Sequence, residues 1–145
     1  MKFRFETILK MRKSRENLAK KDLALVNAHL LKQQDRLQFL EETEEKSKRE
    51  LDARSRREID VNQMVLYDQF FGGVRAQEKF QTKIIAEVSV QLEKKRALLA
   101  EAMRRRRTME ILKERETQAY EKLQMKRETE LLDEAGTAQW RMKSL

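Results

Sequence analysis

The stretch that decides the fold is AKKDLALVNAHLLKQQDRLQFL, residues 19–40. Its apolar side chains recur in alternating steps of three and four, at Leu23, Val26, Leu30, Leu37 and Leu40. Such steps place side chains on one face of a helix, and a seven-residue period is typical of a coiled coil. The stretch therefore predicts a long helix whose apolar stripe is buried against a second helix.

The same stripe extends in both directions, where its positions become polar. Counted from Ile8, it passes through Arg15, takes two successive steps of four to reach Leu23, and ends at Leu51. Two steps of four in a row are a stutter, an interruption of the heptad repeat. The other half of the chain carries a second stripe, with positions at Ile85, Val88, Leu92, Arg96, Leu99, Met103, Arg106 and Met109. Two stripes in one chain predict two helices that pack on each other.

The composition excludes most other folds. The 145 residues include no Pro, no Cys and three Gly, and 40% of them are charged. Tight turns draw on Gly and Pro, so this chain has few turns and sheet-rich folds are excluded. The lack of Cys excludes disulfides and thiolate metal sites. We expect a single all-α unit over residues 1–145, an antiparallel two-helix coiled-coil hairpin that is monomeric.

Two places can reverse the chain. One is the stretch at about 58–62, where Asp60 or Asn62 can cap a new helix. The other is Gly72-Gly73, a helix-breaking pair at the midpoint of the chain. Both remain open at this stage, although the pairing of the two stripes favours the first.

Facing residues of an antiparallel pair have numbers with a constant sum. A reversal near residue 59 places Leu30 against Val88, whereas a reversal at Gly72-Gly73 places Leu30 near Arg115. The apolar match predicts a first helix over about 3–57 and a second over about 63–140, with Gly72-Gly73 as a possible kink in the second. By the same pairing, residues from about 116 to about 140 extend past the N-terminus of the first helix.

The net charge of +8 is concentrated in two segments. Residues 1–30 carry eight basic and three acidic side chains, and residues 94–107 carry seven basic and one acidic. In the favoured register Arg106 falls opposite Arg12, so like charges meet unless an anion neutralises them. The run 104–107 is either a specific contact or a solvated helix face. It lacks the spaced aromatic residues of a single-strand binder, and no DNA-binding motif is present, so no nucleic-acid partner is expected.

Membrane spans and catalytic groups are both absent from the pattern. The chain starts without the apolar segment of a signal peptide, and its longest apolar runs are four residues, far short of the roughly 20 that span a membrane. We therefore expect a cytoplasmic protein, at most peripheral to a membrane. His29 is the only histidine, so no metal site or cofactor is expected. A two-helix coiled coil also offers no catalytic pocket, so we expect no enzyme.

Exposed apolar groups indicate partner surfaces. Phe70 and Phe71 are adjacent, and two adjacent Phe cannot both be buried in a two-helix seam. Phe71 can turn toward the first helix, while Phe70, Val74, Gln77 and Gln81 share one helical stripe. This stripe is either a partner surface or local packing near the reversal. Two further candidates are the N-terminal tip, which contains Phe3, Phe5, Ile8 and Leu9, and the apolar C-terminal overhang.

The order of these features resembles that of the bacterial flagellar export protein FliJ family. The matching segments are Phe3-Arg4-Phe5 followed by Ile8-Leu9 and Arg12, then Tyr67-Asp68-Gln69-Phe70-Phe71, Glu110-Ile111-Leu112-Lys113-Glu114-Arg115 and Leu131-Leu132-Asp133-Glu134. The resemblance covers nearly the full length. The equivalent stalk component of virulence type III secretion systems is a near relative. A generic coiled-coil scaffold and a basic nucleic-acid-associated protein remain the alternatives.

The resemblance implies a fold similar to the central stalk subunit of rotary ATPases. It further implies a protein at the inner membrane of the flagellar base that couples the hexameric export ATPase to the membrane export gate and handles export chaperones. The implied gate contact is Phe70, Val74, Gln77 and Gln81. The implied contact with the ATPase ring comprises Phe3, Phe5, Ile8, Leu9, Arg12, Arg106, Leu123, Leu131 and Leu132. Gly72-Gly73 departs from the family pattern within the gate stretch.

Overall fold

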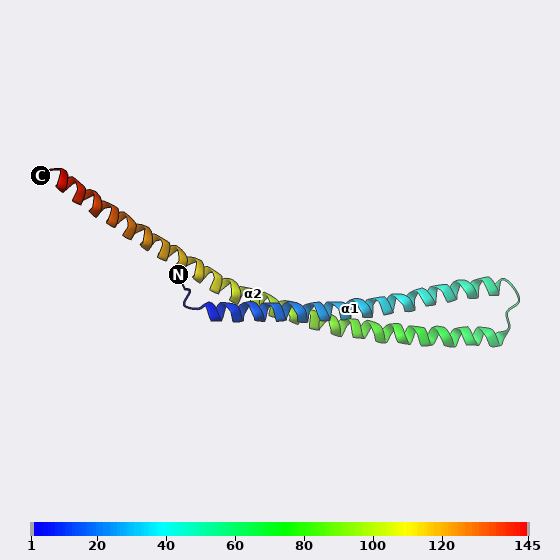
Figure 1. Cartoon of the computed structure of the whole chain (residues 1–145). Helices are drawn as coiled ribbons and strands as arrows, with labels where there is room; N and C mark the ends of the chain where they lie inside the picture. Colours follow the sequence, from blue (N-terminus) through cyan, green and yellow to red (C-terminus); the bar gives the residue numbers. More distant parts are fainter. Residues whose placement is uncertain (1, 145) are drawn as a thin grey trace. The chain divides into compact units, whose positions relative to one another are not determined.

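A computed structural model describes residues 2–144, and this part of the chain consists of two long helices without strands. Helix α1 spans Glu6–Ser55 and helix α2 spans Val61–Lys143. The two helices pack on each other, so the predicted all-α hairpin is confirmed. In Figure 1, the chain leaves α1, turns through one short loop and returns as α2.

The chain divides into two compact units, each with a segment of both helices. Unit 1 comprises Met1–Asn17 and Ala100–Leu145, and unit 2 comprises Leu18–Leu99. Helix α2 runs through Gly72-Gly73 without a break, and neither glycine has a positive φ. A chain reversal at this glycine pair therefore does not occur.

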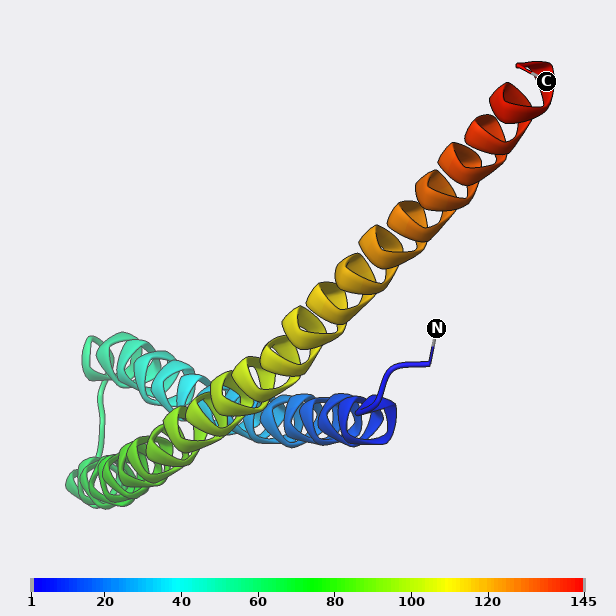
Figure 2. The ribbon, with the colours of Figure 1, turned by 90° about the vertical axis from the view of Figure 1, so that its left-hand side faces the viewer.

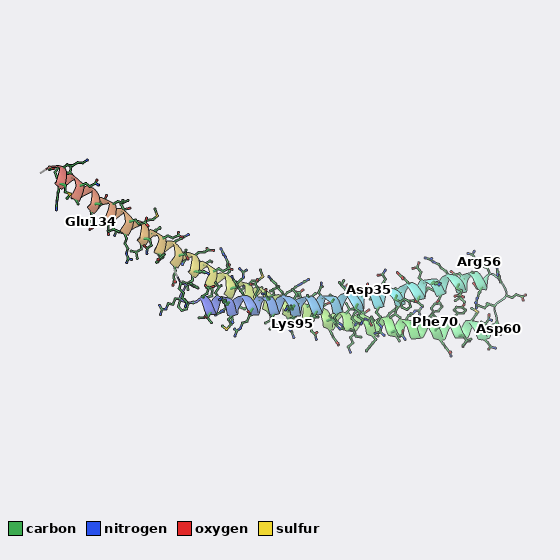
Figure 3. All side chains as sticks on the ribbon, viewed as in Figure 1. Asp35, Arg56, Asp60, Phe70, Lys95 and Glu134 are labelled. Carbon is green, nitrogen blue, oxygen red and sulfur yellow. The ribbon has the colours of Figure 1, made fainter. Side chains whose placement is uncertain are left out.

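Residues 56–60 join the helices at the end of unit 2. Ser55 closes α1, and its hydroxyl donates a hydrogen bond to the Asp52 carbonyl at 3.0 Å. Asp60 is the N-cap of α2, because its carboxylate accepts the backbone N–H of Asn62 at 3.5 Å and its carbonyl accepts that of Met64 at 3.1 Å. Figure 3 labels Arg56 and Asp60 at the two ends of this loop.

The two helices of unit 2 lie side by side in both ribbon views (Figures 1 and 2). Leu30 of α1 forms a buried cluster with Val88 and Leu92 of α2. Partly buried side chains that pack against this cluster are Leu23, Val26, Ile84 and Ile85. The cluster is small because two helices cannot enclose a core, so stability depends on the whole length of the seam.

The seam of α1 follows an unbroken heptad repeat, and the expected stutter is wrong. Leu9 is 1% exposed, whereas Ile8 is 37% exposed, so the repeat starts one residue later than expected. From Leu9 it passes through Arg12 and the buried Glu16 rather than through the exposed Arg15. Adjacent apolar residues at 8 and 9 and adjacent charged residues at 15 and 16 made the two phases indistinguishable by pattern alone.

A similar correction applies to α2. After Leu92, Lys95 and Ala102 are partly buried, whereas Arg96 and Met103 are exposed. Lysine buries its aliphatic stem and keeps its ammonium group in water, which allows Lys95 to occupy a seam position. With these two residues the seam of α2 also keeps alternating steps of three and four from Tyr67 to Glu116. The a and d positions of the heptad are therefore fixed for both helices.

Candidate interaction surfaces

The structure separates the four residues of the expected gate contact. Phe70 is 42% exposed and Gln77 is exposed, whereas Val74 is 6% and Gln81 3% exposed. Val74 and Gln81 occupy seam positions that face α1, and Phe70 and Gln77 occupy the flanking g positions. Half of the expected stripe is thus accessible to a partner, and the other half holds the hairpin together.

Gln81 is buried because its polar group is satisfied across the seam. Its side-chain N–H donates to the carbonyl of Gln33 at 3.0 Å and to the side-chain oxygen of Gln33 at 2.6 Å. A buried amide without these bonds would destabilise the fold. The pair therefore fixes the register of α1 against α2 at this level.

Aromatic side chains line a groove close to the loop. Phe71 is buried and stacks on Tyr67 with 6.2 Å between ring centroids, while Phe70 meets Phe71 edge to face at 5.8 Å. The Arg54 guanidinium lies 5.9 Å from the centroid of the Tyr67 ring. An open groove of about 400 Å³ is lined by Ser47, Arg54, Gln63, Leu66, Tyr67 and Phe70. Figure 3 labels Phe70 on α2 at this end of unit 2.

Two seam carboxyl groups, Glu44 and Glu78, shift each other's pKa further along unit 2. Glu44 forms ion pairs with Lys48 at 3.2 Å and with Arg75 at 3.4 Å. The interaction with Glu78 is the largest cause that lowers the pKa of Glu44. The same interaction is the largest cause that raises the pKa of Glu78, and burial is the second. Of the two carboxyl groups, Glu78 is therefore the one that is protonated more readily. Oε1 of Glu78 is buried without a hydrogen-bond partner among residues 2–144.

The N-terminal tip belongs to unit 1 and is partly buried. Phe3 is 5% exposed and meets Phe5 edge to face at 6.0 Å. Phe3 also lines a groove together with Lys113 and Thr117 of α2. Phe3 and Leu9 are therefore buried, and Ile8 remains accessible. Of the apolar residues in this tip that were expected to contact the ATPase ring, Ile8 is the most exposed.

Arg106 lies at the centre of an ion-pair network in unit 1. Its guanidinium contacts the carboxylate of Glu16 across the seam and that of Glu110 at 2.8 Å along α2. The hydrogen bond to Glu110 is the largest cause that raises the pKa of Arg106, and the bond to Glu16 adds to it. In return, the hydrogen bond from Arg106 lowers the pKa of Glu110. The expected clash between Arg106 and Arg12 is thus relieved within the chain, because the seam places Glu16 beside Arg106.

The other arginines of the run 104–107 are also paired. Arg104 and Arg105 contact Glu101 at 3.8 Å and 3.0 Å, and Arg107 contacts Glu110 and Glu114, both at 3.3 Å. The contacts with Glu101 and Glu110 have the i, i+3 or i, i+4 spacing of helix-surface ion pairs, and that between Arg107 and Glu114 spans two turns. The run therefore carries a smaller effective positive charge than its sequence indicates.

The last part of α2 has no partner helix among the described residues. Leu123, Leu131 and Leu132 are 47%, 65% and 73% exposed, and Trp140 is 70% exposed. Glu134, labelled in Figure 3, marks this segment. These apolar side chains are therefore accessible to another molecule. Neither a group of three acidic, His or Cys side chains suited to a metal nor a helix long and apolar enough to cross a membrane occurs in residues 2–144.

Sequence reasoning missed the pairing of charged residues across the seam. Glu16, Glu44 and Glu78 all occupy a positions, which apolar residues usually fill. The signal was available in the constant-sum rule, because 16 with 106 and 44 with 78 have the same sum. For Glu16 it was hidden by the phase error in α1, which assigned Arg15 to the seam, and for Glu78 by the start of the expected second stripe at Ile85.

These features define a class of protein: a charged all-α helical hairpin with accessible apolar side chains in both of its units. The chain matches the family described as Flagellar FliJ protein over residues 1–144, so it belongs to the FliJ family. No curated protein and no solved structure matches the chain. Membership makes it a protein associated with flagellar export at the base of the flagellum, in a family of structural and adaptor proteins rather than known enzymes.

Proposed function

We propose that this protein is the central stalk and adaptor of the flagellar type III export apparatus. In this role it couples the hexameric export ATPase to the membrane export gate and handles export chaperones. It acts from the cytoplasmic side, peripheral to the inner membrane, as a monomeric hairpin without a cofactor. The observation that carries the proposal is the full-length family match combined with the unpartnered end of α2.

The end that enters the ATPase ring is unit 1. It combines the N-terminal tip with the overhang of α2, where Leu123, Leu131 and Leu132 are exposed. In this proposal Ile8 and the three leucines contact the ring. Phe3, Phe5, Leu9, Arg12 and Arg106 support them by packing and ion pairing inside the unit. Because the arginines 104–107 already have carboxylate partners, the geometry favours this division over binding to nucleic acid.

The end that reaches the gate is unit 2, through the two accessible residues of the gate stripe. Phe70 supplies an exposed ring and Gln77 an exposed amide on the same side of α2. Val74 and Gln81 act indirectly, because their burial against α1 fixes the position of this face. Substitution of Val74 or Gln81 is therefore expected to lower stability as well as export.

The ring contact is tested by stimulation of the purified export ATPase. Replacement of Leu131 and Leu132 by Asp is expected to abolish stimulation while leaving the helix content unchanged, since both side chains are exposed. The matched control replaces Leu25 and Leu31, which are 71% and 55% exposed in unit 2, by Asp. Full stimulation by the Leu131/Leu132 variant would refute the proposed ring contact. Loss of export in cells after Phe70→Ala and Gln77→Ala tests the gate contact separately.

A further inference from the structure

The exposed apolar residues of unit 2 are distributed unevenly around the hairpin. In an antiparallel coiled coil the g and c positions of both helices share one face, and the e and b positions share the opposite face. Large exposed apolar side chains at g or c positions are Leu18, Leu25, Phe39, Leu66, Phe70, Phe80 and Leu98. Those at e or b positions are Leu31, Val61 and Val65. One face of the unit is thus far more apolar than the other.

Contacts within unit 2 support this assignment of faces. The groove near the loop combines d positions of α1, Ser47 and Arg54, with the c and g positions of α2, Leu66 and Phe70. On the opposite side, Lys48 and Arg75 are both e positions, and both contact the same Glu44 carboxylate. The g and c positions of the two helices therefore lie on one side. We call the side that carries Phe39, Phe70 and Phe80 the aromatic face.

The aromatic face is also basic in the stretch where its three phenylalanines lie. Between residues 23 and 49 of α1, its charged side chains are Lys32, Arg36 and Lys46, and its positions between residues 62 and 86 of α2 are uncharged. Outside this stretch the same face carries Asp22, Glu50, Glu87 and Lys94. Within residues 2–144, none of these three bases forms an ion pair, whereas Lys48, Arg75 and Arg96 on the opposite face do. Three unpaired cations beside three exposed rings have the chemistry of a site for an anionic, apolar partner.

The constant-sum register places the components of this face close together. Phe39 and Phe80 have numbers that sum to 119, the same sum as the observed contact between Glu44 and Arg75. The two rings are therefore at one level of the hairpin, with Phe70 ten residues, or roughly 15 Å, nearer the loop. An extended stripe of this kind matches the i, i+3, i+4, i+7 anchors of a helix rather than a small molecule.

We propose that the aromatic face is the docking surface for an acidic amphipathic helix of a partner protein. The apolar stripe of that helix lies along Phe39, Phe70 and Phe80, and its carboxylates pair with Lys32, Arg36 and Lys46. A second copy of this chain fits less well, because two such faces would bring the same cations together. The inference rests on the proposed function in that it names the partner chemistry of the surface that contains Phe70 and Gln77.

The test measures binding of synthetic peptides to the full-length protein by fluorescence anisotropy. One peptide is an amphipathic helix of about 21 residues with a Leu stripe flanked by Glu, and the control peptide has Lys in place of Glu. We expect binding of the Glu peptide that weakens at high salt, and at least about 10-fold weaker binding of the Lys peptide. Equal binding of both peptides, or no binding of the Glu peptide, would overturn the proposal.

Matched variants assign the binding to this face. The Phe39→Ala/Phe80→Ala variant is expected to weaken binding of the Glu peptide by about 10-fold or more, because buried aromatic anchors dominate such interfaces. The Lys32→Glu/Arg36→Glu variant is expected to reverse the preference between the two peptides. Leu31→Ala/Val65→Ala changes the opposite face and is expected to leave binding within about twofold. Circular dichroism of each variant verifies that the helices remain.

Two outcomes contradict the proposal in different ways. Unchanged affinity of the Phe39/Phe80 variant would place the peptide elsewhere on the chain. A dimer in sedimentation that the same two substitutions dissociate would make the aromatic face a contact between two copies. Since the assay contains neither the ATPase nor the gate, its result is independent of the stimulation and export experiments, and failure of one proposal is distinguishable from failure of the other.

Discussion

Leu30 and Leu31 are adjacent leucines whose substitution by Ala tests the seam directly. Leu30 is 9% exposed and packs with Val88 and Leu92, whereas Leu31 is 55% exposed on the opposite face. Both substitutions make the same chemical change in the same helix, so helix propensity contributes equally to both. Any difference in stability between the two variants therefore reports burial in the seam.

The magnitude follows from the atoms removed. Leu→Ala deletes three carbon atoms, and at about 0.8 kcal/mol for each buried methylene group this amounts to about 2.4 kcal/mol. The additional cost of a cavity is small here, because two helices leave the site open on both sides and side chains can relax into it. We expect Leu30→Ala to lower the free energy of unfolding by about 2–3 kcal/mol and Leu31→Ala to change it by less than about 0.5 kcal/mol.

Urea denaturation followed by circular dichroism at the helical minimum measures both values. The slope of the transition is expected to be the same for the two variants, since both expose the same surface on unfolding. Equal destabilisation by the two substitutions would refute the heptad phase assigned to α1. A larger effect of Leu31→Ala would place the seam on the opposite side of the helix.

Three further predictions concern polar and glycine positions. Glu78→Gln is expected to raise the free energy of unfolding near neutral pH, and this gain disappears as pH falls toward 4.5. The pKa of Glu78 is raised in the folded protein, so the stability that its proton provides is complete below the ordinary pKa and is lost as pH rises through the folded-state pKa. Thermal melts at several pH values measure the gain, and a pH-independent gain would contradict the reasoning. Glu16→Leu alone is expected to destabilise unit 1, because it leaves Arg106 without its partner across the seam. The double variant Glu16→Leu/Arg106→Leu is expected to restore or exceed the original stability. A double variant as unstable as the single one would argue against the pairing. Gly72→Ala and Gly73→Ala are each expected to stabilise α2 by about 0.8–1 kcal/mol, because Ala has the higher helix propensity and the added Cβ meets nothing within 4 Å. A lower melting temperature of these variants would show that the glycines serve a conformation other than the straight helix.

The sequence established the helical class with few residues. The heptads of residues 19–40, together with the lack of Pro and the scarcity of Gly, leave no alternative to long paired helices. The sequence also pointed to the last part of α2 as an apolar segment without a partner helix. These features depend on local periodicity and composition, which are properties of the chain alone.

Only the tertiary structure decided the phase of each seam. Ile8 and Leu9 differ little in hydrophobicity, and Arg15 and Glu16 are both charged, so either phase satisfies the pattern of a single helix. The second helix places Arg106 at this level of the seam. Arg106 forms an ion pair with the carboxylate of Glu16, whereas Arg15 in the same place would repel it. The same reasoning separates Val74 and Gln81, which face α1, from Phe70 and Gln77, which face solvent. The period of a helix is a local property of its sequence. The side of the helix that is buried is determined by the partner helix against which it packs.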